Sequence, residues 1–237
     1  MINTYHNWLL SIVIPTYNEA DRVLPTLESV VAFLRLQTYS WEVIVVDDGS
    51  FDKTPSIVSN WIEENIGAGE FCRVILVDHR GKGSAIKVGM LSAGGAYRLM
   101  CDADLAVSPE QIGKFVGFIE RGNYDIVIGS RQVGGAQRLH DSPLRYFTGR
   151  LFNWFVRAIA VPGIQDTQCG YKCFTKEAAE HLFQKQRVKG WGFDVEILFL
   201  AAKENMDILE MPVSWVCLLY TSDAADERSS VDLGGRR

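Results

Sequence analysis

The sequence contains little cysteine, and its cysteines do not stand at the spacing of a metal or redox motif. The chain of 237 residues includes five of them: Cys72, Cys101, Cys169, Cys173 and Cys217. They form no C-x-x-C pair and no dense framework, so we expect a reduced environment and no disulfide scaffold. If residues 166–174 form a strand, Cys169 and Cys173 lie roughly 13 Å apart, which is too far for a disulfide.

Long apolar runs and an excess of positive charge are also missing. No stretch reaches the roughly 18 apolar residues that a membrane-spanning helix needs. The N-terminus has neither the basic segment nor the small-residue cleavage site of a signal peptide. The net charge of −5 disfavours a general nucleic-acid binder. These absences predict a soluble or peripheral protein with no nucleic acid as a partner.

The first half of the chain alternates strand and helix patterns. A hydrophobic content of 47% suits one large α/β domain. Strands are expected at 8–15, 41–46, 74–77, 97–101 and 124–128, and helices at 19–36, 54–62 and 84–93. This alternation predicts a mainly parallel sheet with helices on both faces. In such sheets ligands bind at the carboxyl ends of the strands.

The second half is less regular. We expect a loop at 129–142, a helix at 143–160, a turn and short strand at 166–174, a helix at 192–202 and a last strand at 208–215. Residues 219–237 have no sustained apolar period and end in Gly-Gly-Arg-Arg. We interpret this stretch as a disordered tail that does not look native, and residues 1–218 as the domain.

Acidic residues follow several of the expected strands. Asp102-Ala103-Asp104 comes directly after the strand at 97–101, and two carboxylates at this spacing suit Mg²⁺ or Mn²⁺. The alternative is a solvated turn that caps the strand. Asp47-Asp48-Gly49-Ser50 follows another strand, where carboxylates accept hydrogen bonds from a nucleotide or only shape the turn. Residues 80–84 open a helix whose N–H groups suit a phosphate, although they do not form a Walker A motif.

Four of these segments together resemble glycosyltransferase family 2, whose members have the inverting GT-A fold. The segments are residues 14–19, 46–50, 81–83 and 102–104, and the resemblance covers residues 10–216. It implies a GT-A, Rossmann-like α/β fold and a nucleotide-sugar substrate. The contacts that it implies with this substrate are Pro15, Tyr17, Glu19, Asp47, Asp48, Lys82 and Asp102. It also implies that Asp102 and Asp104 hold the metal, with Asp104 the better ligand.

Motifs in the second half narrow the resemblance to the dolichyl-phosphate β-glucosyltransferase branch. They are Gly129-Ser130-Arg131, residues 166–172 and residues 191–196, and Asp104-Leu105-Ala106 in the first half also favours this branch. The mannosyl branch typically has glutamine where Ala106 stands. The branch implies metal-dependent transfer of glucose from UDP-glucose to dolichyl or polyprenyl phosphate, with inversion. A lipid-linked phosphate acceptor implies a place at the cytosolic face of a membrane, either peripheral or anchored by a C-terminal segment that the chain lacks.

An arginine-rich segment supports a phosphate acceptor. Residues 129–160 contain five arginines and one aspartate, a local charge of +4. Because arginine binds phosphate with two parallel hydrogen bonds, we expect Arg131, Arg138 and Arg145 to hold the acceptor phosphate. Residues 144–161 also carry aromatic side chains, which favours a helix in the membrane interface. A core helix with snorkelling arginines is the rival interpretation.

The catalytic residues predicted by the resemblance are Asp104, Arg131 and Asp166. A phosphate monoester is already largely anionic at neutral pH, so Asp166 is expected to position the acceptor and not to act as a base. Asp194 and Glu196 are expected only to fix arginine or lysine side chains. Four other hypotheses remain: a GDP-mannose-dependent dolichyl-phosphate mannosyltransferase, a family 2 transferase acting on a glycan hydroxyl, a nucleotide-sugar-binding module without activity, and a nucleotidyltransferase.

Overall fold

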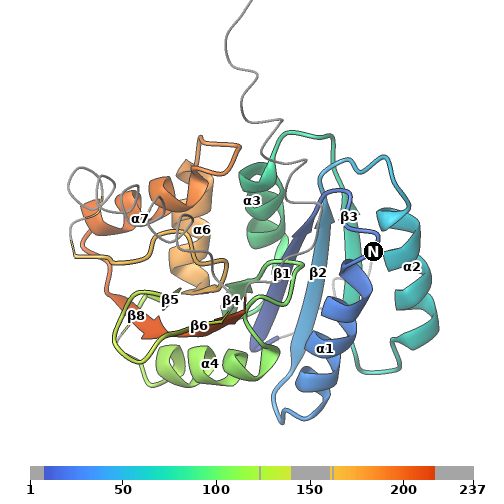
Figure 1. The fold of residues 1–237 in the computed structure, drawn as a ribbon, viewed down its shortest axis with the longest axis horizontal. Helices are drawn as coiled ribbons and strands as arrows, with labels where there is room; N and C mark the ends of the chain where they lie inside the picture. Colours follow the sequence, from blue (N-terminus) through green and yellow to red (C-terminus); the bar gives the residue numbers. More distant parts are fainter. Residues whose placement is uncertain (1–7, 123, 140–160, 162, 217–237) are drawn as a thin grey trace, which may run out of the picture.

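The computed structural model describes residues 8–122, 124–139, 161 and 163–216, and its centre is a seven-stranded sheet (Figure 1). The strand order is β3-β2-β1-β4-β7-β5-β8. The strands are β1 (Leu10–Thr16), β2 (Trp41–Asp47), β3 (Cys72–Leu76), β4 (Tyr97–Met100), β5 (Ile126–Ser130), β7 (Lys172–Thr175) and β8 (Ile208–Pro212). Every neighbouring pair is parallel except those that β7 makes with β4 and β5. The predicted mainly parallel sheet is therefore confirmed.

Helices cover both faces of the sheet, as the alternating pattern predicts (Figure 1). They are α1 (Val23–Arg35), α2 (Thr54–Asn65), α3 (Lys82–Ser92), α4 (Ile112–Glu120), α6 (Lys176–Lys185) and α7 (Phe193–Lys203). Ile12 and Ile14 of β1 belong to the core shared with α1, α2 and α4, whereas Val13 belongs to the core shared with α3, α6 and α7. Side chains alternate along a strand, so a central strand with both faces buried is mostly apolar.

The chain reverses its direction of travel across the sheet between β1 and β4. From β1 it moves outward to β2 and β3, and it then crosses back to β4 on the other side of β1. Open α/β sheets bind their ligands at such a reversal, at the carboxyl ends of the strands. Because β7 runs antiparallel, its first residue, Lys172, lies beside Met100 at the end of β4. The segment that precedes β7 therefore reaches the same edge.

The end of the chain departs from the prediction. The strand expected at 208–215 is two strands, β8 and β9 (Ser214–Val216), which belong to different sheets. Pro212, which has no N–H to donate, ends the pairing of β8 with β5. Beyond it, β9 pairs in parallel with β6 (Gln137–Leu139), so the prediction of a continuous loop at 129–142 is wrong. The predicted helix at 143–160 and the predicted tail at 219–237 lie outside the described residues.

Candidate active site

The residues predicted to carry chemistry meet at the carboxyl edge of the sheet. Asp102 follows β4, Asp48 follows β2, and Glu19 follows β1. Arg131 follows β5, and Asp166 lies in the segment that leads into β7. Segments far apart in the sequence thus lie at one edge, because the parallel strands end there and the antiparallel β7 begins there.

The two carboxylates of the D-x-D motif differ in their partners. Asp102 accepts a hydrogen bond from the Lys82 ammonium at 2.6 Å. Asp104 accepts one from the amide N–H of Ala106 at 2.9 Å, across Leu105, whose φ is +56°. Burial opposes the ionisation of Asp102, but the charge and hydrogen bond of Lys82, together with the charges of Lys172 and Arg131, outweigh it, so the pKa of Asp102 is lowered. Burial raises the pKa of Asp104, and the neighbouring charge of Asp102 raises it further.

The charges at this edge fit a divalent cation. Among the described side chains, Lys82 is paired with Asp102, Arg131 with Asp166, and Lys172 with Asp194. Asp104 is a further carboxylate at this edge, and its hydrogen bond comes from a neutral amide. Hard cations prefer carboxylate oxygen and often complete their shell with water and phosphate. No cluster of three or more His, Cys, Asp or Glu suited to a metal occurs within the described ranges.

Gly170 leaves room for the carboxylate of Asp102. A Cβ at this position would lie 2.0 Å from Oδ2 of Asp102 and 2.5 Å from its Cγ. Any other residue would therefore push the Asp102 side chain away from its place beside Lys82. This contact gives a physical reason for glycine in the segment that leads into β7, and the sequence alone does not reveal it.

Arg131 and Asp166 form a buried two-pronged ion pair. The Nε and Nη2 atoms of Arg131 donate to the two carboxylate oxygens of Asp166 at 2.7 and 2.9 Å, and the backbone N–H of Arg131 also donates to Asp166. Asp166 is fully buried. Burial opposes its ionisation, but the hydrogen bonds and charge of Arg131 keep the pKa of Asp166 below its usual value. The carboxylate thus stays ionised and orients the guanidinium. Arg138 lies in β6, its side chain is outside the described part, and Arg145 lies outside it altogether.

Asp47 and Asp48 are buried and bind the backbone of nearby turns. Asp48 accepts hydrogen bonds from the N–H groups of Arg80 and Gly81 at 3.0 and 2.8 Å. It thereby connects the end of β2 to the segment that opens α3. Asp47 accepts two hydrogen bonds from Ser50, one from its N–H and one from its hydroxyl. Both carboxylates hold turns at the carboxyl edge of the sheet, and their contact with a nucleotide stays a prediction.

The residues after β1 border the same turns. Pro15 pairs within the sheet beside β2. The ring of Tyr17 stacks on His79 at 4.1 Å and meets the exposed Phe51 edge-on at 5.7 Å. Glu19 pairs with Arg22 at 2.7 Å at the start of α1. The roles of Pro15, Tyr17 and Glu19 toward a nucleotide sugar also stay predictions.

Two features of the site were not found from the sequence. Lys172 is buried and donates to Asp194 at 2.6 Å, which confirms the expectation that Asp194 fixes a basic side chain. A basic residue inside a buried strand was the available signal. Trp215 of β9 lies under the Arg131 guanidinium at 5.6 Å, and no sequence signal points to it. The matching expectation for Glu196 is wrong, because its carboxylate accepts backbone N–H groups at the start of the turn before α7.

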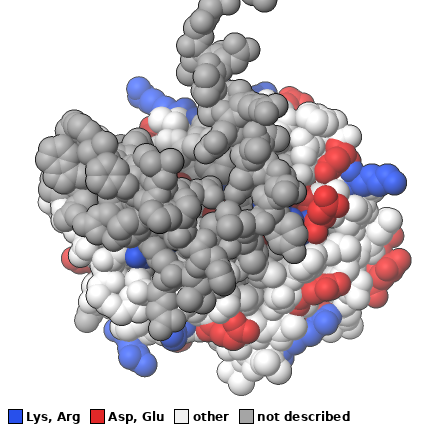
Figure 2. Space-filling model, viewed as in Figure 1, with Lys and Arg blue, Asp and Glu red and all other residues white. Residues whose placement is uncertain are grey.

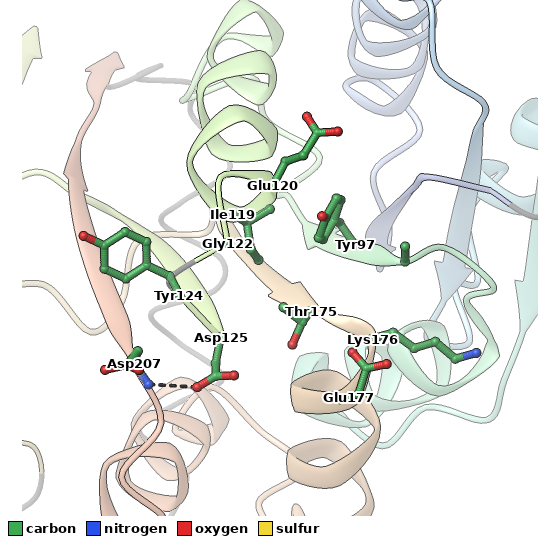
Figure 3. Close-up of a pocket in the computed structure, with 11 residues that line it drawn as sticks. Tyr97, Ile119, Glu120, Gly122, Tyr124, Asp125, Thr175, Lys176, Glu177 and Asp207 are labelled. Atoms are coloured by element: carbon green, nitrogen blue, oxygen red, sulfur yellow. Dashed lines mark hydrogen bonds between the residues drawn. The ribbon is translucent and has the colours of Figure 1, made fainter.

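The remaining surface holds a pocket far from this edge. It has a volume of about 670 Å³ and lies at the amino ends of β4 and β5, where Tyr97 and Asp125 line it (Figure 3).

In the view of Figure 2, acidic side chains gather over the region where Figure 1 places α1 and α2. Among the described residues no helix combines the length and apolarity needed to cross a membrane.

The strand order of the sheet and the D-x-D carboxylates at its carboxyl edge define a protein of the GT-A class. A mannosyltransferase from Pyrobaculum calidifontis, solved with GDP-mannose and Mn²⁺, matches with a TM-score of 0.62 and 22% identity. The match covers 94% of this chain and 60% of that one. Glucosyl-3-phosphoglycerate synthase from Mycobacterium tuberculosis, solved with Mn²⁺, UDP and glucosyl-3-phosphoglycerate, matches with a TM-score of 0.65 and 18% identity. The match covers 88% of this chain and 71% of that one. At these identities the likeness establishes the fold.

The family follows from the sequence comparisons. The profile described as "Glycosyl transferase family 2" matches residues 11–183, and the chain belongs to this family. Dolichyl-phosphate beta-glucosyltransferase ALG5C of Trichomonas vaginalis is 39% identical over 216 residues, or 86% of this chain. Dolichyl-phosphate beta-glucosyltransferase of Dictyostelium discoideum is 38% identical over 229 residues, or 90% of this chain. The chain spans 62% and 68% of the lengths of these two relatives.

Proposed function

We propose that this chain is a metal-dependent, inverting hexosyltransferase that moves glucose from UDP-glucose to dolichyl or polyprenyl phosphate. The observation that carries the proposal is the place of the Arg131–Asp166 pair at the same sheet edge as the D-x-D carboxylates. Such a transfer needs an oriented guanidinium that binds the acceptor phosphate. It also needs carboxylates that hold a metal ion at the donor diphosphate. The names of the two relatives support glucose and dolichyl phosphate as the substrates.

The pairing of both Asp166 oxygens with Arg131 supports a phosphate as the nucleophile. In the proposed reaction an oxygen of the lipid phosphate attacks the anomeric carbon of the sugar, and the bond from this carbon to UDP breaks. A phosphate monoester is already largely ionised at neutral pH, so no base has to remove a proton. Asp166 is a poor base, because Arg131 engages both of its oxygens. Its task is to hold Arg131, which in turn holds the acceptor phosphate.

The donor diphosphate is bound by three residues on the donor side: Asp102, Asp104 and Lys82. Asp102 and Asp104 would hold Mg²⁺ or Mn²⁺, which neutralises the charge that develops on the departing UDP. Mn²⁺ in the two solved structures supports a divalent ion for this chain. Lys82, whose ammonium already lies beside Asp102, supplies a positive charge for a diphosphate oxygen.

The acceptor also determines where the chain works. A dolichyl or polyprenyl phosphate stays in a bilayer, so the carboxyl edge of the sheet has to face a membrane surface. We propose a peripheral position at the cytosolic face for the described domain. Co-sedimentation with vesicles tests this position: binding to polyprenyl-phosphate vesicles is expected, and failure to bind them contradicts it.

A donor and acceptor matrix tests the whole proposal. Purified protein is incubated with Mg²⁺ or Mn²⁺ and either UDP-glucose or GDP-mannose, on a polyprenyl phosphate or on a glycan with a free hydroxyl. Transfer from UDP-glucose to the lipid phosphate, abolished by a chelator, is the expected result. Transfer from GDP-mannose alone would identify a mannosyltransferase, and transfer to the glycan alone would require a catalytic base.

A further inference from the structure

Trp191 is an exposed tryptophan beside the D-x-D motif. It lies in the turn between α6 and α7, and 68% of it is exposed, whereas the other described tryptophans are buried or half-buried. The Lys82 ammonium lies over its ring, 4.6 Å from the centroid. The same ammonium donates to Asp102 at 2.6 Å. Lys82 therefore contacts both an aromatic face and a carboxylate.

The backbone, and not the side-chain contact, places Trp191 beside Lys82. The N–H of Ser84 in α3 donates to the carbonyl of Lys189 at 3.0 Å. A Cβ on Gly83 would lie 2.9 Å from the carbonyl oxygens of Lys189 and Gly190, so the two segments pack backbone against backbone. Replacing the indole ring should therefore leave the turn in its place.

Lys82 needs a second anchor if it is to bind a diphosphate. Its flexible four-carbon chain carries a compact, strongly hydrated charge, and Asp102 is the carboxylate that the proposed function assigns to the metal. Contact with an aromatic face stabilises an ammonium by about 0.5–2 kcal/mol. This contact does not use a carboxylate oxygen. The Trp191 ring can thus hold the ammonium while the carboxylate of Asp102 serves another cation.

We propose that Trp191 is a positioning residue: it keeps the Lys82 ammonium at the diphosphate when Lys82 exchanges Asp102 for a donor phosphate oxygen. This inference rests on the proposed function, because it needs a nucleoside diphosphate at the D-x-D edge. It assigns to Trp191 an effect on donor binding that passes through Lys82, without contact between the indole and the substrate.

A double-mutant cycle tests the route of this effect. UDP affinity is measured by calorimetry at saturating Mn²⁺ for wild type, Trp191→Ala, Trp191→Phe, Lys82→Met and the double variant Lys82→Met/Trp191→Ala. Trp191→Ala is expected to weaken UDP binding about 3–10-fold, and Trp191→Phe to recover most of it, because phenylalanine keeps an aromatic face. With Lys82→Met already present, removing Trp191 should change the affinity less than about two-fold.

Three results would overturn the role of Trp191. They are an unchanged affinity in Trp191→Ala, an equal loss with and without Lys82, and an equal loss in the control Phe118→Ala. Phe118 is an aromatic residue of α4 that is 39% exposed. Thermal unfolding of each variant shows that the fold is intact. Wild-type protein that binds GDP and not UDP would instead contradict the proposed donor, and the same cycle measured with GDP would then decide the role of Trp191.

Discussion

The charges on the two sides of the site are held in different ways. On the acceptor side, Arg131 with Asp166 and Lys172 with Asp194 form ion pairs in which both carboxylates are buried. On the donor side, Asp102 is half-buried and paired with Lys82, and Asp104 has the N–H of Ala106 as its described partner. Buried pairs keep a fixed geometry because separating them exposes an uncompensated charge. A carboxylate with a neutral donor is instead ready for a cation.

The largest effect is expected at Asp104, the donor-side carboxylate whose described partner is a neutral N–H. Asp104→Asn should lower kcat roughly 10³-fold, because it removes a charged metal ligand worth several kcal/mol in the transition state. The free energy of unfolding should hold or rise, since the pKa of Asp104 is raised by burial and by Asp102. Initial rates and thermal unfolding measure the two effects. Glu64→Gln on the exposed side of α2 is the control, and a stable variant with normal kcat would contradict the metal role.

On the acceptor side, one variant should harm both activity and stability. Arg131→Ala should lower kcat/KM for the lipid phosphate about 10²-fold through lost charge-assisted hydrogen bonds. It should also lower the free energy of unfolding by about 3 kcal/mol, because it leaves Asp166 buried without its partner. Kinetics and denaturant unfolding measure these losses. The double variant Arg131→Met/Asp166→Leu should recover stability and not activity; recovery of both would contradict the role of Arg131.

Gly170 tests whether the two sides depend on each other. Gly170→Ala places a methyl group 2.0 Å from Oδ2 of Asp102, so the acceptor-side segment displaces a donor-side carboxylate. We expect Mn²⁺ affinity to fall about 10–100-fold, the usual range for groups that orient a metal ligand. Calorimetry with Mn²⁺ and UDP measures the change. Gly134→Ala is the control, because nothing lies within 4 Å of a Cβ there, and equal affinities in the two variants would contradict the coupling.

A smaller effect is expected from lowering the pH, which should reduce activity before it removes the contribution of Asp166 to stability. The folded pKa of Asp104 is raised, so activity should fall as pH decreases through this pKa and protonates the metal ligand. The folded pKa of Asp166 is lowered, so its contribution to stability is present above the ordinary aspartate pKa and is lost only as pH falls through the lower folded value. Rates and unfolding free energies across acidic pH check the order. Simultaneous loss of both would contradict it.

Local sequence patterns were enough for the central part of the fold. The apolar runs of β1 and β2 and the helical period of α1 depend on burial of one or two faces, and this leaves a periodic signal in the sequence. β6 could not be found in this way. It has three residues and is a strand because β9 lies beside it, and a pairing partner leaves no mark on local periodicity.

The sequence by itself determined which chemical groups are present and which strand end carries each: two carboxylates after β4, an arginine after β5, a glycine-rich start to α3. Only the tertiary structure decided their partners. The antiparallel β7 carries Asp166 to Arg131 and Gly170 to Asp102, and the turn before α7 carries Trp191 to Lys82. The physical reason is that composition and spacing act along the chain, whereas ion pairs, steric contacts and aromatic faces act across distances that the order of the strands sets.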